Sequence, residues 1–171
     1  MSNETVFVKY AIEKLEQYES RVKACVRKLT PAQVWARSAS NENAIGNLLL
    51  HLNGNVRQWI ICGIGGERDT RQRQTEFDAQ EGFSPEELLA RLHGTLAEAR
   101  AVISGLRAER LAEPLKIQGY DVTVLQAVFH VVEHFSGHTG QIIFATKYLT
   151  GEDLGFYRHL RVAAAHDEKT P

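Results

Sequence analysis

The sequence predicts an all-α fold: a four-helix bundle with a long crossover between its second and third helices. Four long stretches carry apolar residues at alternating spacings of three and four, the period of an amphipathic helix, and strand-like alternation is nearly absent. About twenty residues separate the second stretch from the third, many more than a tight helix hairpin needs. We expect residues 1–171 to form a single domain.

The first helix is predicted from about residue 4 to residue 29. Pro31 ends it because proline cannot continue a helix, and the segment PAQVW is expected to add a short turn. The second helix is predicted from about Asn43 to Cys62, where a cluster of glycines stops it.

The third helix is predicted to begin at Ser84-Pro85-Glu86-Glu87, which combines an N-cap serine, a proline in the first turn and a capping-box glutamate. After Pro114 the segment LKIQGYDVT is interpreted as a turn, and either Asp121 or Thr123 is expected to cap the fourth helix. That helix extends to about Leu149. A short C-terminal piece, DLGFYRHLRVAAA, is predicted to pack back on the bundle.

Composition limits the classes of partner. Lys plus Arg total 20 against 21 Asp plus Glu, for a formal charge of −1, which argues against nucleic acid or an anionic membrane as the main partner. No apolar run approaches the roughly 20 residues of a membrane span, and the N-terminus lacks a signal-peptide pattern. We therefore expect a cytoplasmic protein that acts on a small molecule. Cys25 and Cys62 lack CxxC spacing and are interpreted as buried free thiols.

Three of the seven histidines lie four residues apart on the predicted fourth helix, at His130, His134 and His138. Residues at this spacing project from one side of a helix. The charged residues of that helix, Glu133 and Lys147, mark its solvent edge, and His138 lies about 140–180° away from them at 100° per residue. The histidine row is therefore predicted to turn inward.

A fourth histidine, His51, lies on the shoulder of the apolar stripe of the second helix, a position that suits either a cleft or the surface. Together with His134 and His138 it would form a three-ligand centre with open positions, as in catalytic metal sites. Imidazole ligands suit zinc, nickel, iron or copper. The patterns HExxH and paired Glu-x-x-His are absent, which argues against a zincin or a di-iron bundle.

These residues resemble the DinB/YfiT-like superfamily of four-helix metalloproteins. The resemblance rests on His51 in IGNLLLHLNGNVRQW and on His134 and His138 in HFSGHTGQII, and RDTRQRQTEF and KYLTGEDLGFYRHL resemble an uncharacterised branch of it. It implies that these three histidines bind a divalent metal, with zinc or nickel favoured and iron a further option, and it implies a homodimer. His130 is outside the usual triad. His130, Gln141 and Asn55 remain candidates for groups that support the ligands or act as acid or base, and packing is slightly favoured for His130.

Three functions follow from the resemblance and from the metal chemistry. Relatives include transferases and isomerases that use a low-molecular-weight thiol such as bacillithiol or mycothiol, so a metal-dependent thiol transferase is the first expectation. Hydrolysis through metal-bound water is the second, and a non-catalytic, stress-linked metal-binding module is the third. Arg68, Arg71 and Arg73 could guide an anionic substrate, but the acidic residues among them favour surface salt bridges. Trp35 and Trp59 are expected to be packing residues.

Overall fold

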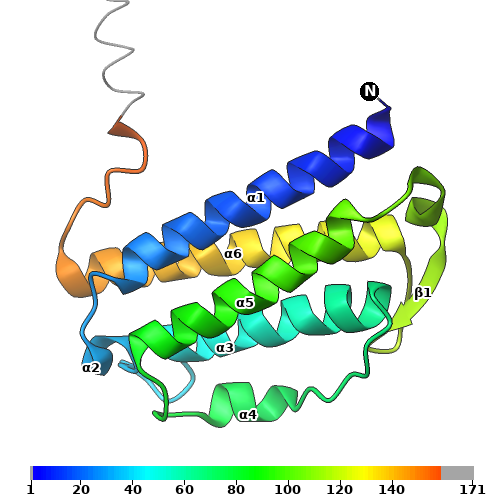
Figure 1. The fold of residues 1–171 in the computed structure, drawn as a ribbon. Coiled ribbons are helices and arrows are strands. Elements are labelled where there is room, and N and C mark those ends of the chain that lie inside the picture. Colours follow the sequence, from blue (N-terminus) through cyan, green and yellow to red (C-terminus); the bar gives the residue numbers. More distant parts are fainter. Residues whose placement is uncertain (1, 159–171) are drawn as a thin grey trace, which may run out of the picture.

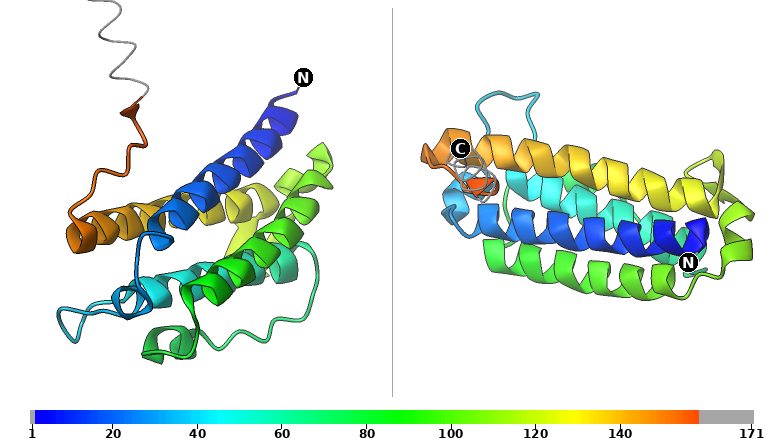
Figure 2. Two further views of the ribbon diagram at one scale, coloured as in Figure 1. Left: turned by 60° about the vertical axis from the view of Figure 1, so that its left-hand side comes forward. Right: turned by 90° about the horizontal axis from the view of Figure 1, so that it is seen from above.

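Four long helices run alongside one another in the computed structural model, which describes residues 2–158 (Figure 1). They are α1 (Asn3–Val26), α3 (Ile45–Val56) with its continuation η1 (Arg57–Ile64), α5 (Pro85–Ser104) and α6 (Val124–Thr150). Helices α1 and α6 run in one direction and α3 and α5 in the other (Figures 1 and 2). The predicted bundle and its long crossover between the second and third long helices are therefore confirmed.

Side-chain caps set the starts of the long helices. The Ser2 hydroxyl accepts from the backbone of Thr5 at the start of α1, and Ser84 forms the predicted capping box that opens α5. Of the two candidate caps for α6, the structure uses Thr123, and Asp121 lies in the preceding strand. Helix α1 ends at Val26, earlier than predicted.

The second long helix changes its winding after Val56, which no sequence pattern predicted. Residues Arg57–Ile64 form a π-helix, η1, which extends two residues beyond the predicted end at Cys62. A π-helical stretch is rare and commonly marks a functional region. Gly63 lets the neighbouring hairpin approach, since a Cβ there would lie 2.5 Å from the Ile117 side chain.

Five short elements connect the long helices. The expected turn at PAQVW is α2 (Pro31–Val34), whereas α4 (Arg73–Asp78) and the 3-10 helix η2 (Ala108–Ala112) were not predicted. The predicted turn LKIQGYDVT is wrong: β1 (Pro114–Ile117) and β2 (Tyr120–Thr123) form an antiparallel hairpin. Gln118 and Gly119, at φ 53° and φ 83°, make a two-residue turn whose positive φ angles match the twist of a hairpin.

The core lies between the four long helices and contains their apolar seams. The largest fully buried side chains include Leu15, Leu52, Leu96, Phe135 and Ile142, which come from all four helices. Leu154 and Phe156 also pack against this core, as predicted for the start of the C-terminal piece, whose remainder lies outside the described residues. Within residues 2–158, no helix has the length and apolar character needed to cross a membrane.

Candidate metal centre

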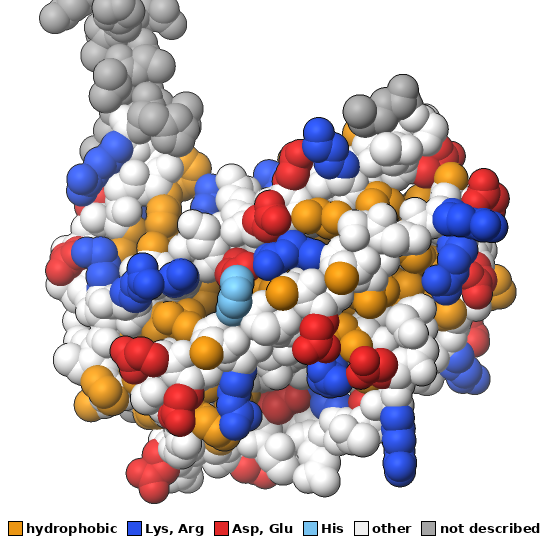
Figure 3. All heavy atoms as spheres, in the orientation of Figure 1, with side chains coloured by type: hydrophobic (Ala, Val, Ile, Leu, Met, Phe, Trp, Pro, Cys, Tyr) orange, Lys and Arg blue, Asp and Glu red, His pale blue; other side chains and the backbone are white. Residues whose placement is uncertain are grey.

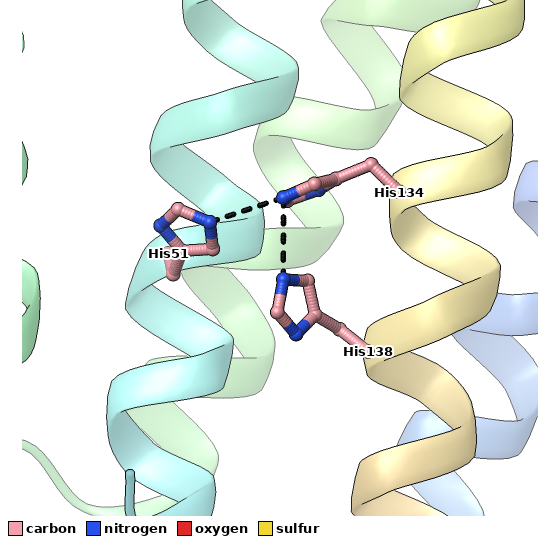
Figure 4. Close-up of side chains that lie close together, drawn as sticks. All are labelled: His51, His134 and His138. Atoms are coloured by element: carbon pink, nitrogen blue, oxygen red, sulfur yellow. Dashed lines mark hydrogen bonds between the residues drawn. The ribbon is translucent and has the colours of Figure 1, made fainter. Parts of the chain in front are cut away.

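Three histidine side chains meet between α3 and α6 (Figure 4). The Nε2 atom of His134 lies 3.1 Å from Nε2 of His51 and 3.2 Å from Nε2 of His138. One nitrogen from each ring lies within 4.8 Å of the other two, so the three side chains could hold a metal ion. We call His51, His134 and His138 the histidine cluster.

The arrangement of the bundle brings the cluster together. His134 and His138 are one turn apart on α6, and their rings meet edge to face with centroids 4.4 Å apart. His51 reaches them from α3, which packs against α6. The sequence left His51 between a cleft and the surface, and the structure places it in the interior with 5% of its surface exposed.

A buried ion pair supports His51 on the side opposite the cluster. His51 Nδ1 lies 3.0 Å from Glu76 Oε2, and Arg71 bonds both oxygens of the same carboxylate at 2.7 Å. The side chains of Arg71 and Glu76 are only 6% and 10% exposed. The expectation of surface salt bridges is therefore wrong for this pair. The two residues come from the crossover, which folds against α3 and removes both charges from solvent.

The crossover is anchored to α3 by polar contacts and by close packing. The Asn47 amide donates to the carbonyls of Glu76 and Ala79 at 2.8 and 2.7 Å, and Asn47 is fully buried. Gly54 makes room for the ion pair, because a Cβ there would lie 2.1 Å from Glu76 Oε1 and 2.7 Å from Arg71 Nε. A larger residue at this position would push the carboxylate away from His51.

Hydrogen bonds fix the proton positions on two of the three rings. Burial alone would raise the pKa of Glu76, but hydrogen bonds from Arg71 and His51 outweigh it, lower the pKa and keep the carboxylate ionised. An ionised carboxylate only accepts, so the contact with Glu76 requires the proton on His51 Nδ1 and leaves the Nε2 lone pair facing the cluster. Arg71 Nη2, which lies 3.1 Å from the same Nδ1, donates to Glu76 Oε2 at 2.7 Å. Gln141 Oε1, 2.7 Å from His138 Nδ1, fixes His138 in the same way. His134 Nδ1 is buried without a hydrogen-bond partner among the described residues.

Two rings of the cluster, those of His134 and His138, are held in the neutral form. Burial, reinforced by the neighbouring His138 and His51, lowers the pKa of His134 to about 3. Burial also lowers the pKa of His138, although its hydrogen bond to Gln141 acts in the opposite direction. Neutral imidazoles have free lone pairs at pH 7, which is the state that binds metals.

The donor set fits a divalent cation better than a network of hydrogen bonds. A neutral His134 can carry at most one proton on Nε2, and that proton can point to His51 or to His138 but not to both. A cation accepts a lone pair from all three rings at once. Neutral nitrogen donors suit zinc, nickel, iron and copper, so the residues present fit a transition metal without selecting one.

The remaining candidates from the sequence lie in different surroundings. His130 is one turn from His134 and its ring packs on Trp59, with centroids 4.0 Å apart. Asn55 Nδ2 lies 3.4 Å from His130 Nε2, and neither residue is among the three that meet. Gln141 is the candidate that hydrogen-bonds to the cluster, and the His130 ring contacts the His134 ring with centroids 5.5 Å apart. Trp59 is 3% exposed and belongs to the core, in keeping with a packing residue.

A cavity of about 450 Å³ lies on the far side of the ion pair. Arg71 and Glu76 line it together with Asn53, Arg57 and Phe83, and the three histidines of the cluster do not. The ion pair therefore separates this cavity from the cluster. No sequence pattern predicted the cavity or the pair, since the residues come from separate helices and loops.

Arg73 is an exposed cation near the cluster. The Phe77 ring lies 4.8 Å from the His51 ring, and the Arg73 guanidinium lies over the Phe77 ring, 4.7 Å from its centroid.

Cys25 is buried, Cys62 is half-buried, and both are free. Burial raises the pKa of both thiols, so neither has the character of a nucleophile.

The fold and site define a class: a four-helix bundle with a histidine cluster between its second and fourth long helices, and solved proteins of similar fold include two described as DinB-like. The structure resembles a conserved protein from Enterococcus faecalis with a TM-score of 0.73 at 13% identity, covering 84% of this chain and 97% of that one. A DinB-like protein from Bacillus subtilis aligns with a TM-score of 0.66 at 15% identity over 86% and 96% of the two chains. A DinB-like protein from Bacillus cereus gives 0.66 at 13% identity over 84% and 93%.

Residues 2–164 match the family described as "Protein of unknown function (DUF1572)", and the chain belongs to that family. A search of curated proteins gave no match. The solved structures share the fold at low identity, so the chemistry of the cluster must be argued from its own residues.

Proposed function

We propose that the protein is a metal-dependent transferase in which His51, His134 and His138 hold one divalent ion, zinc or nickel first and iron as a further option. The co-substrate would be a low-molecular-weight thiol and the acceptor a small electrophilic molecule. The observation that carries the proposal is the convergence of three imidazoles, with Nε2 of His134 3.1 Å from that of His51 and 3.2 Å from that of His138.

The metal and the protein would have separate tasks. A divalent ion with three protein ligands and open positions supplies Lewis acidity that lowers the pKa of a thiol or water bound to it. The protein fixes the ligands: Glu76 and Arg71 orient the His51 ring, and Gln141 orients the His138 ring. Such support typically determines much of the affinity of a metal site. His134 and His138 are half-buried, which leaves the cluster accessible from one side.

Thiol transfer suits the surroundings of the cluster better than hydrolysis does. The carboxylate that contacts the cluster, Glu76, is bonded at both oxygens by Arg71 and is therefore not available as a general base. A thiol needs only to lose its proton to solvent. Its sulfur then forms a bond to the electrophilic carbon. The displaced electron pair leaves with the halide of an aryl halide, or stays on the oxygen of an epoxide or unsaturated aldehyde, which takes up a proton, so no redox partner is required.

Two further features support a negatively charged thiol co-substrate in a reducing compartment. Arg73 is exposed and lies against Phe77, which itself contacts His51, so a positive charge lies near the entrance to the cluster. Cys25 and Cys62 are both free, as is usual in the cytoplasm. We place the reaction there.

The test is turnover by metal-loaded protein. Aryl halides, epoxides and unsaturated aldehydes would be incubated with cysteine, glutathione, bacillithiol or mycothiol, and thioether products measured by mass spectrometry. We expect product that requires both metal and thiol and that disappears in His134→Ala. The matched control is His93→Ala, because His93 lies on α5 and pairs with Glu19 away from the cluster. Ester or lactone turnover without thiol would establish hydrolysis instead. Absence of turnover by protein that binds metal would contradict an enzymatic function and favour a non-catalytic metal-binding module.

A further inference from the structure

The cavity of about 450 Å³ behind the buried ion pair lies where the crossover between η1 and α5 folds against α3. The crossover, with α4 in it, runs along α3 on the side away from α1 (Figure 1). The lining includes Leu50 and Asn53 of α3, several residues of the crossover, Phe83 just before α5, and Arg91 within α5. We call this space the crossover cavity. Its volume is within the range of pockets that bind small molecules.

Most of the charged groups that line the crossover cavity have partners. The partnered groups are Arg57 with Glu67 and Glu98, Arg71 with Glu76, and Asp69 with Gln58 and the backbone N–H of Arg71. Arg91 forms no ion pair and donates no hydrogen bond among the described residues. Glu87, one turn earlier on α5, interacts with it only through space and is bonded to the backbone N–H of Ser84. The cavity therefore has one positive charge without a direct partner.

The position of Arg91 beside a cavity distinguishes it from the charges of the open surface. Acidic and basic side chains are interspersed on the face that includes α1 and α5 (Figure 3). Exposed charges of mixed sign are screened by solvent and salt, so they give an anion little reason to bind at one point. The walls of a cleft instead concentrate the field of a charge that lines it.

The Arg91 guanidinium is held in place by the ring of Phe83. Its Cζ atom lies 4.1 Å from the ring centroid, which is a cation–π contact. The Phe83 carbonyl accepts from the indole N–H of Trp35 at 3.1 Å, and this bond fixes the chain just before α5. Because the guanidinium is positioned before a ligand arrives, little side-chain entropy is lost when it binds one.

Asn53 is a second polar group without a partner in the same lining. Its side chain makes no hydrogen bond among residues 2–158, and its Oδ1 atom is buried. Most buried polar atoms in proteins have a partner, so an unpaired amide beside a cavity indicates contact with a bound molecule. Such an amide can donate to an anion through its nitrogen and accept from a hydroxyl or an amine through its oxygen.

We propose that the crossover cavity binds a small organic molecule that has a single carboxylate group. Arg91 and Asn53 donate to the carboxylate, and Leu50 and Phe83 contact the carbon skeleton. The ion pair separates this ligand from the histidine cluster, and no histidine of the cluster lines the cavity. The site is therefore independent of the metal centre.

The charges of the lining favour a carboxylate over a phosphate. One unpaired cation, Arg91, matches one negative charge. The carboxylates of Asp69 and Glu76 belong to the same lining and would repel a doubly charged anion more strongly than a singly charged one. The apolar residues of the lining favour an organic acid over an inorganic anion.

Calorimetric titration of benzoate into the full chain tests the site. The protein is first freed of metal on a chelating resin, so that the carboxylate cannot bind an ion at the cluster. We expect saturable binding that is at least about tenfold weaker in Arg91→Gln, because the substitution removes a charge-assisted hydrogen bond. Benzamide, the neutral isostere, should bind the wild type at least about tenfold more weakly than benzoate for the same reason.

Two variants control for effects outside the cavity. Arg107→Gln is matched to Arg91→Gln, because Arg107 is 79% exposed and does not line the cavity. His134→Ala should also bind benzoate as the wild type does, so the result does not depend on metal binding. Circular dichroism checks the folding of each variant, and the benzamide comparison needs no variant.

Three results would overturn the proposal. They are the absence of saturable benzoate binding, equal affinity in Arg91→Gln and wild type, and tighter binding of inorganic phosphate than of benzoate. Equal affinity of the wild type for benzamide and benzoate would also overturn it, because the carboxylate charge would then contribute nothing.

Discussion

At the scale of single residues, the support of the candidate metal centre is asymmetric. His51 and His138 each have a partner that fixes the proton on Nδ1, whereas His134 Nδ1 has none among the described residues. His134 instead contacts both other rings of the cluster. The fixed rings of His51 and His138 thus define the direction of their two Nε2 lone pairs, and His134 supplies the third nitrogen ligand.

Spacing predicted part of this arrangement and could not predict the rest. His134 and His138 were recognisable because residues one turn apart share a helix face. The pairing of His51 with Glu76 spans 25 positions and depends on how the crossover folds against α3. Alternating charges in RDTRQRQTEF indicated exposed salt bridges, and nothing local distinguished Arg71 and Glu76 as the pair that is buried.

Glu76→Gln is expected to weaken metal binding roughly 10–100-fold, because the amide removes the charge that holds the His51 proton and leaves Arg71 without its counterion. Isothermal titration with zinc measures the affinity, and urea unfolding of the metal-free protein separates it from lost stability. Glu81→Gln, an exposed carboxylate outside the site, is the control. Equal zinc affinity in Glu76→Gln and wild type would show that the ion pair is purely structural.

Gly54→Ala is expected to lower both stability and metal affinity, because the added methyl group would meet Glu76 Oε1 at 2.1 Å. Gly94→Ala on α5 meets nothing within 4 Å and should instead stabilise the protein by up to about 1 kcal/mol through helix propensity. Thermal and urea unfolding of the two variants make the comparison. Stabilisation by both substitutions would mean that the close approach at Gly54 is absent in solution.

At the scale of elements, the crossover supplies the support of the cluster as well as connecting α3 to α5. Caps and apolar periodicity predicted the four long helices well, and Ser84-Pro85 placed the start of α5 at its observed residue. The hairpin was missed because its strands have four residues each, too short for alternation to stand out. The π-helical winding of η1 and the short helix α4 arise from tertiary packing, which local propensity does not encode.

Asn47→Ala tests how α4 is held. The substitution removes the Asn47 donor from the carbonyls of Glu76 and Ala79 and leaves the buried N–H of Ala44 without its acceptor, Asn47 Oδ1. Because Arg37 still donates to the Ala79 carbonyl, the expected loss is about 1–3 kcal/mol in the free energy of unfolding. Zinc affinity should fall as well, because the carbonyl of Glu76 is one of the anchors. Asn43→Ala, at an exposed position just before α3, is the control for urea unfolding. A loss under about 0.5 kcal/mol would show that contacts other than those of Asn47 hold the crossover against α3.

At the scale of the whole molecule, the cluster links stability to pH. The pKa of His134 is about 3 in the folded protein, below its ordinary value of 6.5, so the unfolded chain binds more protons between these values. The stability of the metal-free protein is therefore complete above about pH 6.5 and decreases as the pH falls toward 3. His130 and His138, whose pKa values burial also lowers, act in the same direction.

Urea unfolding of metal-free protein from pH 8 to pH 4 measures this dependence. The wild type should lose stability below about pH 6.5, and His134→Ala should lose less over the same interval. Metal should raise the stability at pH 7 and release few protons on binding, because the rings of His134 and His138 are already neutral at that pH. Identical pH profiles for the two proteins would show that His134 is not a buried neutral ring in solution.

The central claim is that His51, His134 and His138 jointly hold one divalent ion. Equilibrium dialysis against zinc and nickel, with elemental analysis of protein made without an affinity tag, measures it most directly. We expect one ion per chain in the wild type and in His93→Ala, and loss of tight binding in each of the three single alanine variants of the cluster. Absence of stoichiometric metal in the wild type, or full retention in His134→Ala, would contradict the account.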